Sequence, residues 1–436
     1  MEQVHVALLG LGTVGKGVWK MLQSHRDLIA KQTGKVFEVK GILIRDLHKD
    51  RHLPGVEDLL TNRFEDLFKQ RIDVVVEAMG GVEPAFTYVQ EAIKRGCHVI
   101  TSNKALIARR GVELSKLAEQ HGVQLFFEAS VGGGIPALGT LQHFLKVNKI
   151  RKILGIVNGT TNYILTKMEQ EKRSFVDVLR EAQEKGYAEA DPSADVDGLD
   201  AVHKLVILIR IVFQINVTVE DIFVQGISDV SLPEIELASA LGYRIKLIAQ
   251  AEQFGEKGPV MASVRPTLLP IDHPLSNING VYNAIYVEGD QVQDLTFVGQ
   301  GAGEQPTASA MVEDLVNAYR LPPVYHAFPT KSLLSVDDSA IGEQFILVKM
   351  NEVLSEKDQV SFIERFKQFG HVKHWVSDKY GQSTVFALIV KDVARDWNEQ
   401  LQARWEQKIH EIKMRPVFTY GCEESEEQLA AAHVSE

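Results

Sequence analysis

Residues 185–205, KGYAEADPSADVDGLDAVHKL, place acidic side chains in a turn and a lysine in the segment that follows. A helical pattern begins by about Asp197, and Asp200 and Lys204 are four residues apart within it. Residues at this spacing share one face of a helix. Because a carboxylate beside an amine can bind a polar substrate and move a proton, the segment predicts a binding and proton-transfer site.

The predicted helix that carries this pair is apolar on nearly every side. Between Leu199 and Val212 the other polar side chains are His203 and Arg210, and a helix that is apolar all round is a buried one. Ion pairs of this spacing are usually surface contacts worth about 0.3–0.5 kcal/mol. Burial instead lowers the pKa of a lysine while a nearby carboxylate raises it, which makes Lys204 a candidate proton shuttle near neutral pH.

The first strand-like run, VHVALL at residues 4–9, ends in GLGTVG, and apolar residues at helical spacing follow. The G-x-G-x-x-G spacing allows a tight turn and a close approach of the backbone to a pyrophosphate. A glycine-rich turn without a ligand is the alternative, but the place between strand and helix favours a dinucleotide site. The residues expected to contact the cofactor here are Gly10, Gly12, Thr13, Val14 and Gly15.

The end of the second predicted strand, VKGILIR at residues 39–45, is the position that selects between the two nicotinamide cofactors. Arg45 at this position favours the 2′-phosphate of NADP. Asp46 beside it is suited to accept from the free ribose hydroxyl of NAD, so both cofactors stay open.

The predicted strand HVITS, residues 98–102, is followed by Asn103 and Lys104. Open α/β sheets bind ligands at the carboxyl ends of their strands. Ser102 and Lys104 are therefore placed to face the nicotinamide and a substrate. From position alone, a lysine that merely caps a strand end in water is an equally good interpretation.

Two further turns combine polar residues with glycine. In residues 128–136, EASVGGGIP, the glycines let several carbonyls turn inward, and with Glu128 they can form an oxygen cage for a hard monovalent cation. A hinge at a domain crossover is the commoner explanation. In residues 158–162, NGTTN, Asn158 and Thr160 offer caps and donors suited to a substrate carboxylate, with plain helix capping as the alternative. The 14 histidines form no metal-ligand spacing, so we predict no zinc site.

Apolar strand-like runs, the last of them VQLFFEA at residues 123–129, alternate with helical patterns such as FEDLFKQ at 64–70 in the first part of the chain, and a helix, PALGTLQHFL at 136–145, is expected next. This order predicts an α/β fold with a Rossmann-type doubly wound parallel sheet. An α+β domain follows it and contains the predicted helix of Asp200 and Lys204, which we call the site helix. Residues 298–304, VGQGAGE, form a second glycine turn that can return the chain to the cofactor. The last elements run in the order βαββαβ, the ferredoxin-like arrangement. The expected parts are a nucleotide-binding domain at 1–135 completed by about 300–322, the α+β domain at 136–299, a linker at 323–341, the ferredoxin-like domain at 342–420 and an acidic tail at 421–436.

The composition excludes several classes of protein. With 47 basic against 58 acidic residues, the net charge of −11 argues against nonspecific nucleic-acid binding. Cys97 and Cys422 are the two cysteines of the 436 residues, which fits a reducing compartment. Because the chain has no signal-peptide pattern and no run of 18 apolar residues, we expect a cytoplasmic protein that does not bind membranes.

Over roughly residues 1–330 the chain resembles homoserine dehydrogenase. Members of this family reduce L-aspartate 4-semialdehyde to L-homoserine with NAD(P)H, in the biosynthesis of threonine, methionine and isoleucine. The resemblance therefore implies an NAD(P)-dependent oxidoreductase that acts on a CH–OH group. It also implies a homodimer or homotetramer, in which residues 136–299 form the catalytic and dimerisation domain. The matching strings are GLGTVGKGV (10–18), TSNKAL (101–106), FEASVGGGIP (127–136), GIVNGTTNYILTKM (155–168), GYAEADPSADVDGLDAVHKL (186–205), RPTLLP (265–270) and GAGEQPTASAMVEDL (301–315).

The resemblance also implies roles for the matching positions. Lys204 resembles the acid that protonates the carbonyl oxygen as hydride arrives, and Lys104 resembles a second lysine near nicotinamide and substrate. Glu189 and Asp200, with Gly186 at the turn, are similar to residues that bind the substrate amino group and the developing hydroxyl. Asp195 is expected to orient Lys204.

Two glycine turns have counterparts in the family as well. The turn at 128–135 is similar to the family's sodium site, and Gly303 resembles a cofactor-contacting position. The implied sodium ligands are the carboxylate of Glu128 and the carbonyl oxygens of Val131, Gly133 and Ile135.

The C-terminal βαββαβ region resembles an ACT regulatory domain but departs from its pattern. Such domains usually bind an amino acid at a turn rich in Asp, Pro and Gly after the first strand, whereas residues 351–358, NEVLSEKD, contain no glycine or proline. The departure puts feedback inhibition by threonine in doubt. It leaves subunit pairing, or an effector bound elsewhere, as the expected role.

Two other functions are less consistent with the sequence. A dehydrogenase that forms an acyl phosphate through a thioester needs an activated thiolate, but Cys97 enters a predicted buried strand and Cys422 lies near the tail. A nucleotide-sensing regulator without catalysis has no need of the proton donor Lys204.

Overall fold

The computed structural model describes residues 1–255, 258–322, 342–394, 396–405 and 408–419. Two compact units divide the chain. The first contains residues 1–157, residues 200–222 and the described chain from Tyr282 to Pro322; the second contains residues 158–199, residues 223–281 and the described chain from residue 342. The predicted linker at 323–341 and the predicted tail at 421–436 lie outside the described residues.

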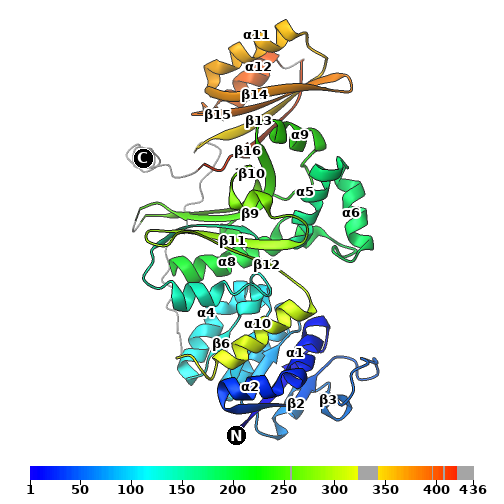
Figure 1. Cartoon of the computed structure of the whole chain (residues 1–436), viewed down its shortest axis with the longest axis vertical. Helices are drawn as coiled ribbons and strands as arrows, with labels where there is room; N and C mark the ends of the chain where they lie inside the picture. The colour runs from blue at the N-terminus through cyan, green and yellow to red at the C-terminus, as the bar shows by residue number, and fades with distance from the viewer. Residues whose placement is uncertain (256–257, 323–341, 395, 406–407, 420–436) are drawn as a thin grey trace. The chain divides into compact units, whose positions relative to one another are not determined.

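A six-stranded parallel sheet forms the centre of the first unit (Figure 1). Its strand order is β3-β2-β1-β4-β5-β6, which is the order of dinucleotide-binding sheets, so the predicted doubly wound fold is confirmed. The strands are β1 Glu2–Leu9, β2 Lys35–Leu43, β3 Leu60–Thr61, β4 Val74–Glu77, β5 His98–Thr101 and β6 Leu125–Phe126.

Helices cover both faces of this sheet because its strands are apolar on both sides. One face packs against α1 (Thr13–Ser24), α2 (Arg26–Thr33) and α10 (Glu304–Asn317). The other face packs against α3 (Ala85–Lys94) and α4 (Lys104–His121). Helix α10 lies beside α1 although 280 residues separate them in the chain (Figure 1). Gly17 permits this contact, since a Cβ there would lie 2.7 Å from the carbonyl oxygen of Glu304.

Three local predictions in this unit were wrong in type or length. Residues 64–69 form a 3₁₀-helix, and the predicted strand at 123–129 is only β6, after which Glu128–Ser130 turns as a 3₁₀-helix. The predicted helix at 136–145 is a short π-helix, Thr140–Phe144. Long-range contacts explain the second case, because the turn aims the backbone N–H of Glu128 at Asp314.

The rest of the first unit contains an antiparallel group of strands and the site helix. The strands are ordered β12-β11-β7, from β7 (Ile150–Ile156), β11 (Tyr282–Gly289) and β12 (Gln293–Gln300). The site helix is α8, Leu199–Phe213, and every residue from Asp200 to Ile211 is buried, as its apolar pattern predicted.

The second unit begins with three helices, α5 (Gly159–Glu171), α6 (Phe175–Glu184) and the short α7 (Ser193–Val196). Its strands β8 (Phe223–Val224), β10 (Val260–Pro270) and β9 (Tyr243–Gln253) pair in that order, and α9 (Leu232–Ala240) packs on β9. The βαββαβ module predicted from the sequence follows in the chain.

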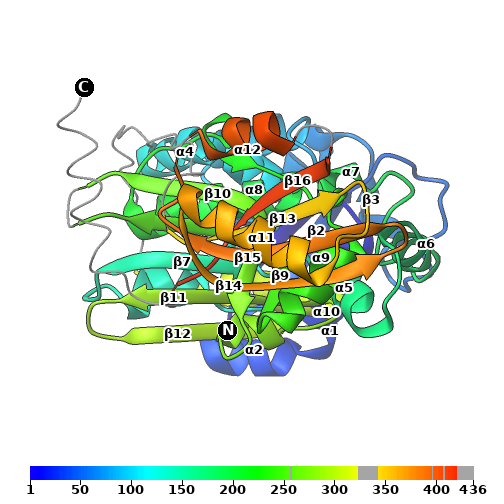
Figure 2. The same cartoon turned by 90° about the horizontal axis from the view of Figure 1, so that it is seen from above.

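The C-terminal module confirms the predicted element order. Its sheet order is β14-β15-β13-β16, and α11 and α12 pack on one face (Figure 2). This is the ferredoxin-like topology; the regulatory role of an ACT domain stays a prediction. The elements are β13 Gln344–Met350, α11 Glu356–Phe366, β14 His371–Tyr380, β15 Ser383–Lys391, α12 Trp397–Trp405 and β16 Ile409–Pro416.

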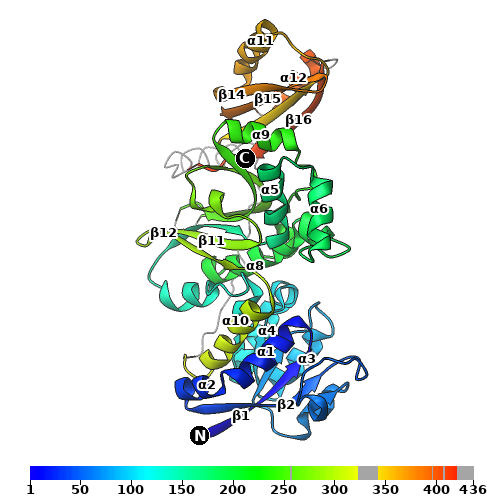
Figure 3. The same ribbon diagram turned by 45° about the vertical axis from the view of Figure 1, so that its right-hand side comes forward.

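The module lies beside α9 (Figure 3), and polar contacts of Arg415 attach it to α9 and to the chain just before it. Arg415 Nε donates to Glu234 Oε1 at 2.7 Å, and Arg415 Nη2 donates to Asp229 Oδ2 at 2.9 Å. Arg415 and Glu234 are almost fully buried, so each charge depends on the other to offset its desolvation.

Among the described residues, no helix is long and apolar enough to cross a membrane.

Candidate active site

Asp200 lies between two lysines in the first unit. Its Oδ2 accepts from Lys204 Nζ at 2.7 Å, and its Oδ1 pairs with Lys104 Nζ at 3.0 Å. The side chains of Asp200 and Lys204 are about one-tenth exposed, whereas that of Lys104 is 42% exposed. One carboxylate therefore holds two ammonium groups, one buried and one open to solvent.

Helix α8 places the buried half of this group. Asp200 and Lys204 are one turn apart, as their spacing predicted, and Lys204 Nζ also donates to the carbonyl oxygen of Val157, just after β7. These contacts direct the ammonium group toward two oxygen acceptors. A lysine held in this way has a fixed direction in which to deliver a proton.

Lys104 is placed by the start of α4, which a buried network holds. The Asn103 side chain accepts from Leu106 N as the helix cap, and its amide donates to the carbonyl oxygen of Gly81 at 2.6 Å. Glu77, fully buried at the end of β4, accepts from Thr101 Oγ1 and from the backbone N–H of Met79. Burial raises the pKa of Glu77.

The sequence reasoning missed Glu77. Its signal was present in DVVVEAM, where a single charged residue ends an apolar parallel strand. Such a residue lies at the ligand-binding edge of the sheet, and here it supports the loop before Lys104.

The first glycine turn has the geometry that a pyrophosphate requires. Gly10 has φ +100°, and a Cβ there would lie 2.7 Å from the carbonyl oxygen of Ala78. Gly12 is the N-cap of α1, has no side-chain cap and faces open space. The first turn of α1 holds no acidic residue, so its N–H groups, those of Thr13 and Val14 included, are available to an anion. Gly15 packs against the Gly10 carbonyl and fits only without a side chain.

The other predicted cofactor residues lie at the same edge or at the second glycine turn. Arg45 is exposed after β2, and the Asp46 carboxylate accepts from the backbone N–H of His48. Ser102 follows β5, and Gly303, with φ +125°, is the uncapped N-cap of α10.

A second group of predicted site residues lies in the second unit. The Asn158 side chain caps α5 by accepting from Thr161 N, and its amide donates to Asp195 Oδ1 at 2.7 Å. Thr160 Oγ1 donates to the carbonyl oxygen of Tyr187. Gly186, with φ +73°, and Glu189 are exposed in the turn before α7. The expected support of Lys204 by Asp195 stays a prediction.

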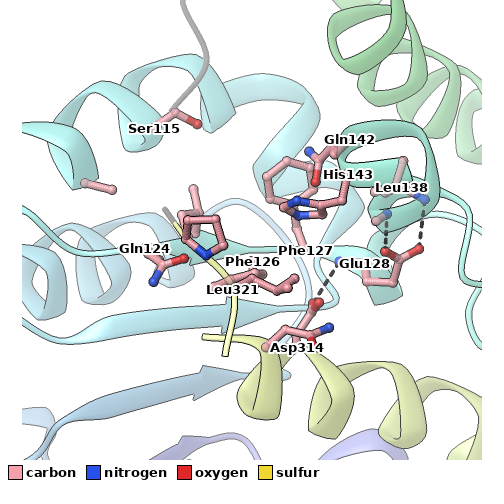
Figure 4. A pocket seen from close by; sticks show the side chains of 15 residues that line it. Ser115, Gln124, Phe126, Phe127, Glu128, Leu138, Gln142, His143, Asp314 and Leu321 are labelled. Atoms are coloured by element: carbon pink, nitrogen blue, oxygen red, sulfur yellow. Dashed lines mark hydrogen bonds between the residues drawn. The ribbon is translucent and has the colours of Figure 1, made fainter. Parts of the chain in front are cut away.

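The Glu128 turn borders a pocket of about 60 Å³ in the first unit (Figure 4). The Glu128 carboxylate accepts from the backbone N–H groups of Leu138 and Gly139, and its own N–H donates to Asp314 at 2.9 Å. Burial raises the pKa of Glu128 to about 7 despite these donors. Gly132 and Gly133 adopt positive φ in this turn, while the predicted cation site stays a prediction.

Comparison with known protein families identifies the family of this chain. A family profile described as homoserine dehydrogenase matches residues 136–316, and one described as the NAD binding domain of homoserine dehydrogenase matches residues 10–128. The homoserine dehydrogenase of Bacillus subtilis is 47% identical over 317 residues, which cover 72% of this chain and 73% of that protein. The chain belongs to the homoserine dehydrogenase family. It is accordingly an NAD(P)-dependent oxidoreductase of the kind that acts on a CH–OH group.

Other members of the homoserine dehydrogenase family agree with this assignment. The enzyme of Corynebacterium glutamicum is 44% identical over 320 residues, 73% of this chain and 72% of that protein. A homoserine dehydrogenase structure from Thiobacillus denitrificans has a TM-score of 0.84 at 33% identity and covers 97% of this chain and 99% of its own. A hyperthermophilic archaeal homoserine dehydrogenase solved in complex with NADPH has a TM-score of 0.62 at 28% identity, covering 74% of this chain and all of its own.

Cys97 provides a prediction that separates this family from thioester-forming dehydrogenases. Its thiol is buried and donates to the carbonyl oxygen of Ile72, and burial raises its pKa to about 11. Since only the thiolate is a nucleophile, iodoacetamide should leave activity nearly unchanged. Peptide mapping would identify any alkylated cysteine, and loss of activity in step with alkylation of Cys97 would contradict the assignment.

Proposed function

We propose that the chain catalyses the reversible reduction of L-aspartate 4-semialdehyde to L-homoserine with NAD(P)H, and that Lys204 is its proton donor. The observation that supports the roles is the shared carboxylate: Asp200 holds Lys204 at 2.7 Å and Lys104 at 3.0 Å. Addition of hydride to an aldehyde leaves charge on its oxygen, and two ammonium groups beside one carboxylate suit that charge.

The bound nicotinamide supplies the hydride that reaches the aldehyde carbon. Lys204, oriented by Asp200 and by the Val157 carbonyl, gives a proton from Nζ to the carbonyl oxygen as charge develops there. Lys104, more exposed, contacts nicotinamide and substrate and stabilises the same oxygen. General acid catalysis of this kind contributes about 10²- to 10⁴-fold in rate.

Four further residues are proposed to hold the substrate. Exposed Glu189 and Gly186 bind the amino group, while Asn158 and the backbone N–H of Thr160 at the N-terminus of α5 suit the carboxylate. The bond between Asn158 and Asp195 fixes the amide orientation. An amino acid aldehyde needs both kinds of contact at once, because it carries both charges.

The cofactor preference is proposed to be NADP(H), with NAD(H) also accepted. Exposed Arg45 offers a charge to a 2′-phosphate, and the Asp46 carboxylate is engaged by His48 N. Arg45→Asp should therefore raise the KM for NADPH about 10- to 100-fold, the equivalent of one charged hydrogen bond, and change that for NADH little. Steady-state kinetics with both cofactors checks this, with Arg26→Asp on exposed α2 as the control. An unchanged KM for NADPH would assign the preference to another residue.

A monovalent cation, sodium, is proposed at the Glu128 turn, with the carbonyl oxygens of Val131, Gly133 and Ile135 as further ligands. The fit is supported by the chemistry of the donors, all of them oxygen, and by the buried carboxylate, whose ionised form a cation would favour. The Ile135 carbonyl also accepts from Ala137 N, so it has one lone pair left for an ion.

We also propose where the chain acts and how it assembles. Two cysteines in 436 residues fit the cytoplasm, and the family assignment supports a homodimer or homotetramer.

The proposed function is tested by steady-state kinetics with L-aspartate 4-semialdehyde. The purified chain should oxidise NADPH, and more slowly NADH, in a one-to-one ratio with homoserine formed. Repeating the assay with sodium and with potassium, and with threonine, tests the cation and the C-terminal module. Absence of nicotinamide oxidation with that substrate would reject the function.

A further inference from the structure

Arg210 is a buried guanidinium that the mechanism above does not use. It lies in the last turn of α8, the helix of Asp200 and Lys204, and is 6% exposed. Burial lowers its pKa to about 10, so it remains charged at neutral pH. Among the residues that the structure describes, no carboxylate pairs with it.

The contacts of Arg210 join three segments of the first unit. Nη1 donates to the carbonyl oxygen of Ile107 at 2.9 Å, and Nη2 donates to that of Val217 at 2.6 Å. Nε has no partner. Ile107 is in α4, three residues after Lys104, and Val217 follows the end of α8. The guanidinium thus links the helix that carries Lys104 to the helix that carries Asp200.

Helices α4 and α8 are therefore joined at two separate levels. At one level the flexible, partly exposed Lys104 reaches Asp200. At the other, the planar and buried guanidinium of Arg210 holds the Ile107 carbonyl. Asp200 and Arg210 are ten residues apart, about 15 Å along a helix. On α4 the two contact points, Lys104 and Ile107, are only three residues apart, so the two contacts hold the first turn of α4 from two positions on α8.

We propose that Arg210 is a positioning residue, which holds α4 against α8 so that Lys104 Nζ stays at Asp200 during the reaction. Stability alone is a poor explanation of this residue. A buried charge is costly to desolvate, and among the described residues Arg210 has two carbonyl oxygens and no carboxylate to offset that cost. The proposal rests on the proposed function, since it concerns the placement of Lys104 in that reaction.

Arg210→Met puts an apolar side chain in place of the charged one and removes both hydrogen-bond donors, Nη1 and Nη2. It should lower kcat with aspartate semialdehyde and NADPH about tenfold, because small misplacements of catalytic groups have effects of this size or larger. The KM for NADPH should not rise, and the melting temperature should not fall. Arg210→Lys, which can reach one carbonyl, should recover part of the loss. Arg110→Met, the same change at an exposed position of α4, is the matched control.

A double-mutant cycle with Lys104→Met decides whether Arg210 acts through Lys104. Arg210→Met should lower kcat about tenfold when Lys104 is present and less than about twofold when it is absent, since residues acting as a unit are not additive. An equal loss in both backgrounds would show a structural role and overturn the proposal.

A measurement without turnover separates this proposal from the proposed function. After brief acetylation, peptide mapping should show that Lys104 reacts faster in Arg210→Met than in the unmodified chain, because its pairing with Asp200 is loosened. Unchanged reactivity of Lys104 would also overturn the proposal, whether or not aspartate semialdehyde proves to be the substrate.

Discussion

Replacing Lys204 by methionine should lower kcat for reduction of aspartate semialdehyde by about 10²- to 10⁴-fold, the usual contribution of a general acid. Methionine nearly preserves the length and apolar contacts of a side chain that is only one-tenth exposed. It removes the ammonium group that Asp200 and the Val157 carbonyl hold. Stopped-flow and steady-state kinetics would measure the loss at the step in which nicotinamide is oxidised.

The controls for Lys204→Met isolate the chemical step. NADPH affinity, measured by fluorescence titration, should stay within about twofold, because the glycine turn at 10–15 is untouched. Lys116→Met, at an exposed position of α4, should keep full activity. A Lys204→Met variant with near-normal kcat would show that another group donates the proton.

Asp200→Asn should have the second largest effect, with kcat lower by about 10²- to 10³-fold. The asparagine oxygen can accept from one lysine, while the other ammonium group loses its carboxylate oxygen. Without the carboxylate the two positive charges repel each other, and both move from their positions. Because both lysines are displaced, the KM for aspartate semialdehyde should rise as well.

The effect of Asp200→Asn should overlap with those of the lysine replacements. In the Lys204→Met background the further loss from Asp200→Asn should be much smaller than in the unmodified chain. The same kinetic assay measures it, with melting temperature as the check on folding. Full additivity of the two changes would contradict a shared role.

The local part of this site was predictable from sequence. Asp200 and Lys204 are four residues apart on a helix with an apolar surface, and helical geometry alone brings them together and buries them. Gly10, Gly12 and Gly15 likewise predict the turn before α1, and at Gly10 and Gly15 the neighbouring backbone excludes a side chain. The βαββαβ order followed from periodicity in the same way.

The long-range part was not predictable in the same way. Position alone left Lys104 as either a catalytic residue or a solvated strand cap, and only tertiary packing brings its Nζ to Asp200 Oδ1. Glu77 and Arg210 are further cases, because the sequence around a single charged residue in an apolar run does not indicate which residue it will contact. The short β6 shows the same limit: the contact of Glu128 N with Asp314 prevails over an apolar pattern that predicted a longer strand.

The most direct test of the central claim is chemical rescue of Lys204→Ala. That variant should be nearly inactive and should regain aspartate semialdehyde reduction when small primary amines are added, with rates that depend on the pKa of the amine, as for a general acid. Thiols and alcohols of similar size should not restore it. Retained NADPH binding without rescue by any amine would contradict Lys204 as the proton donor.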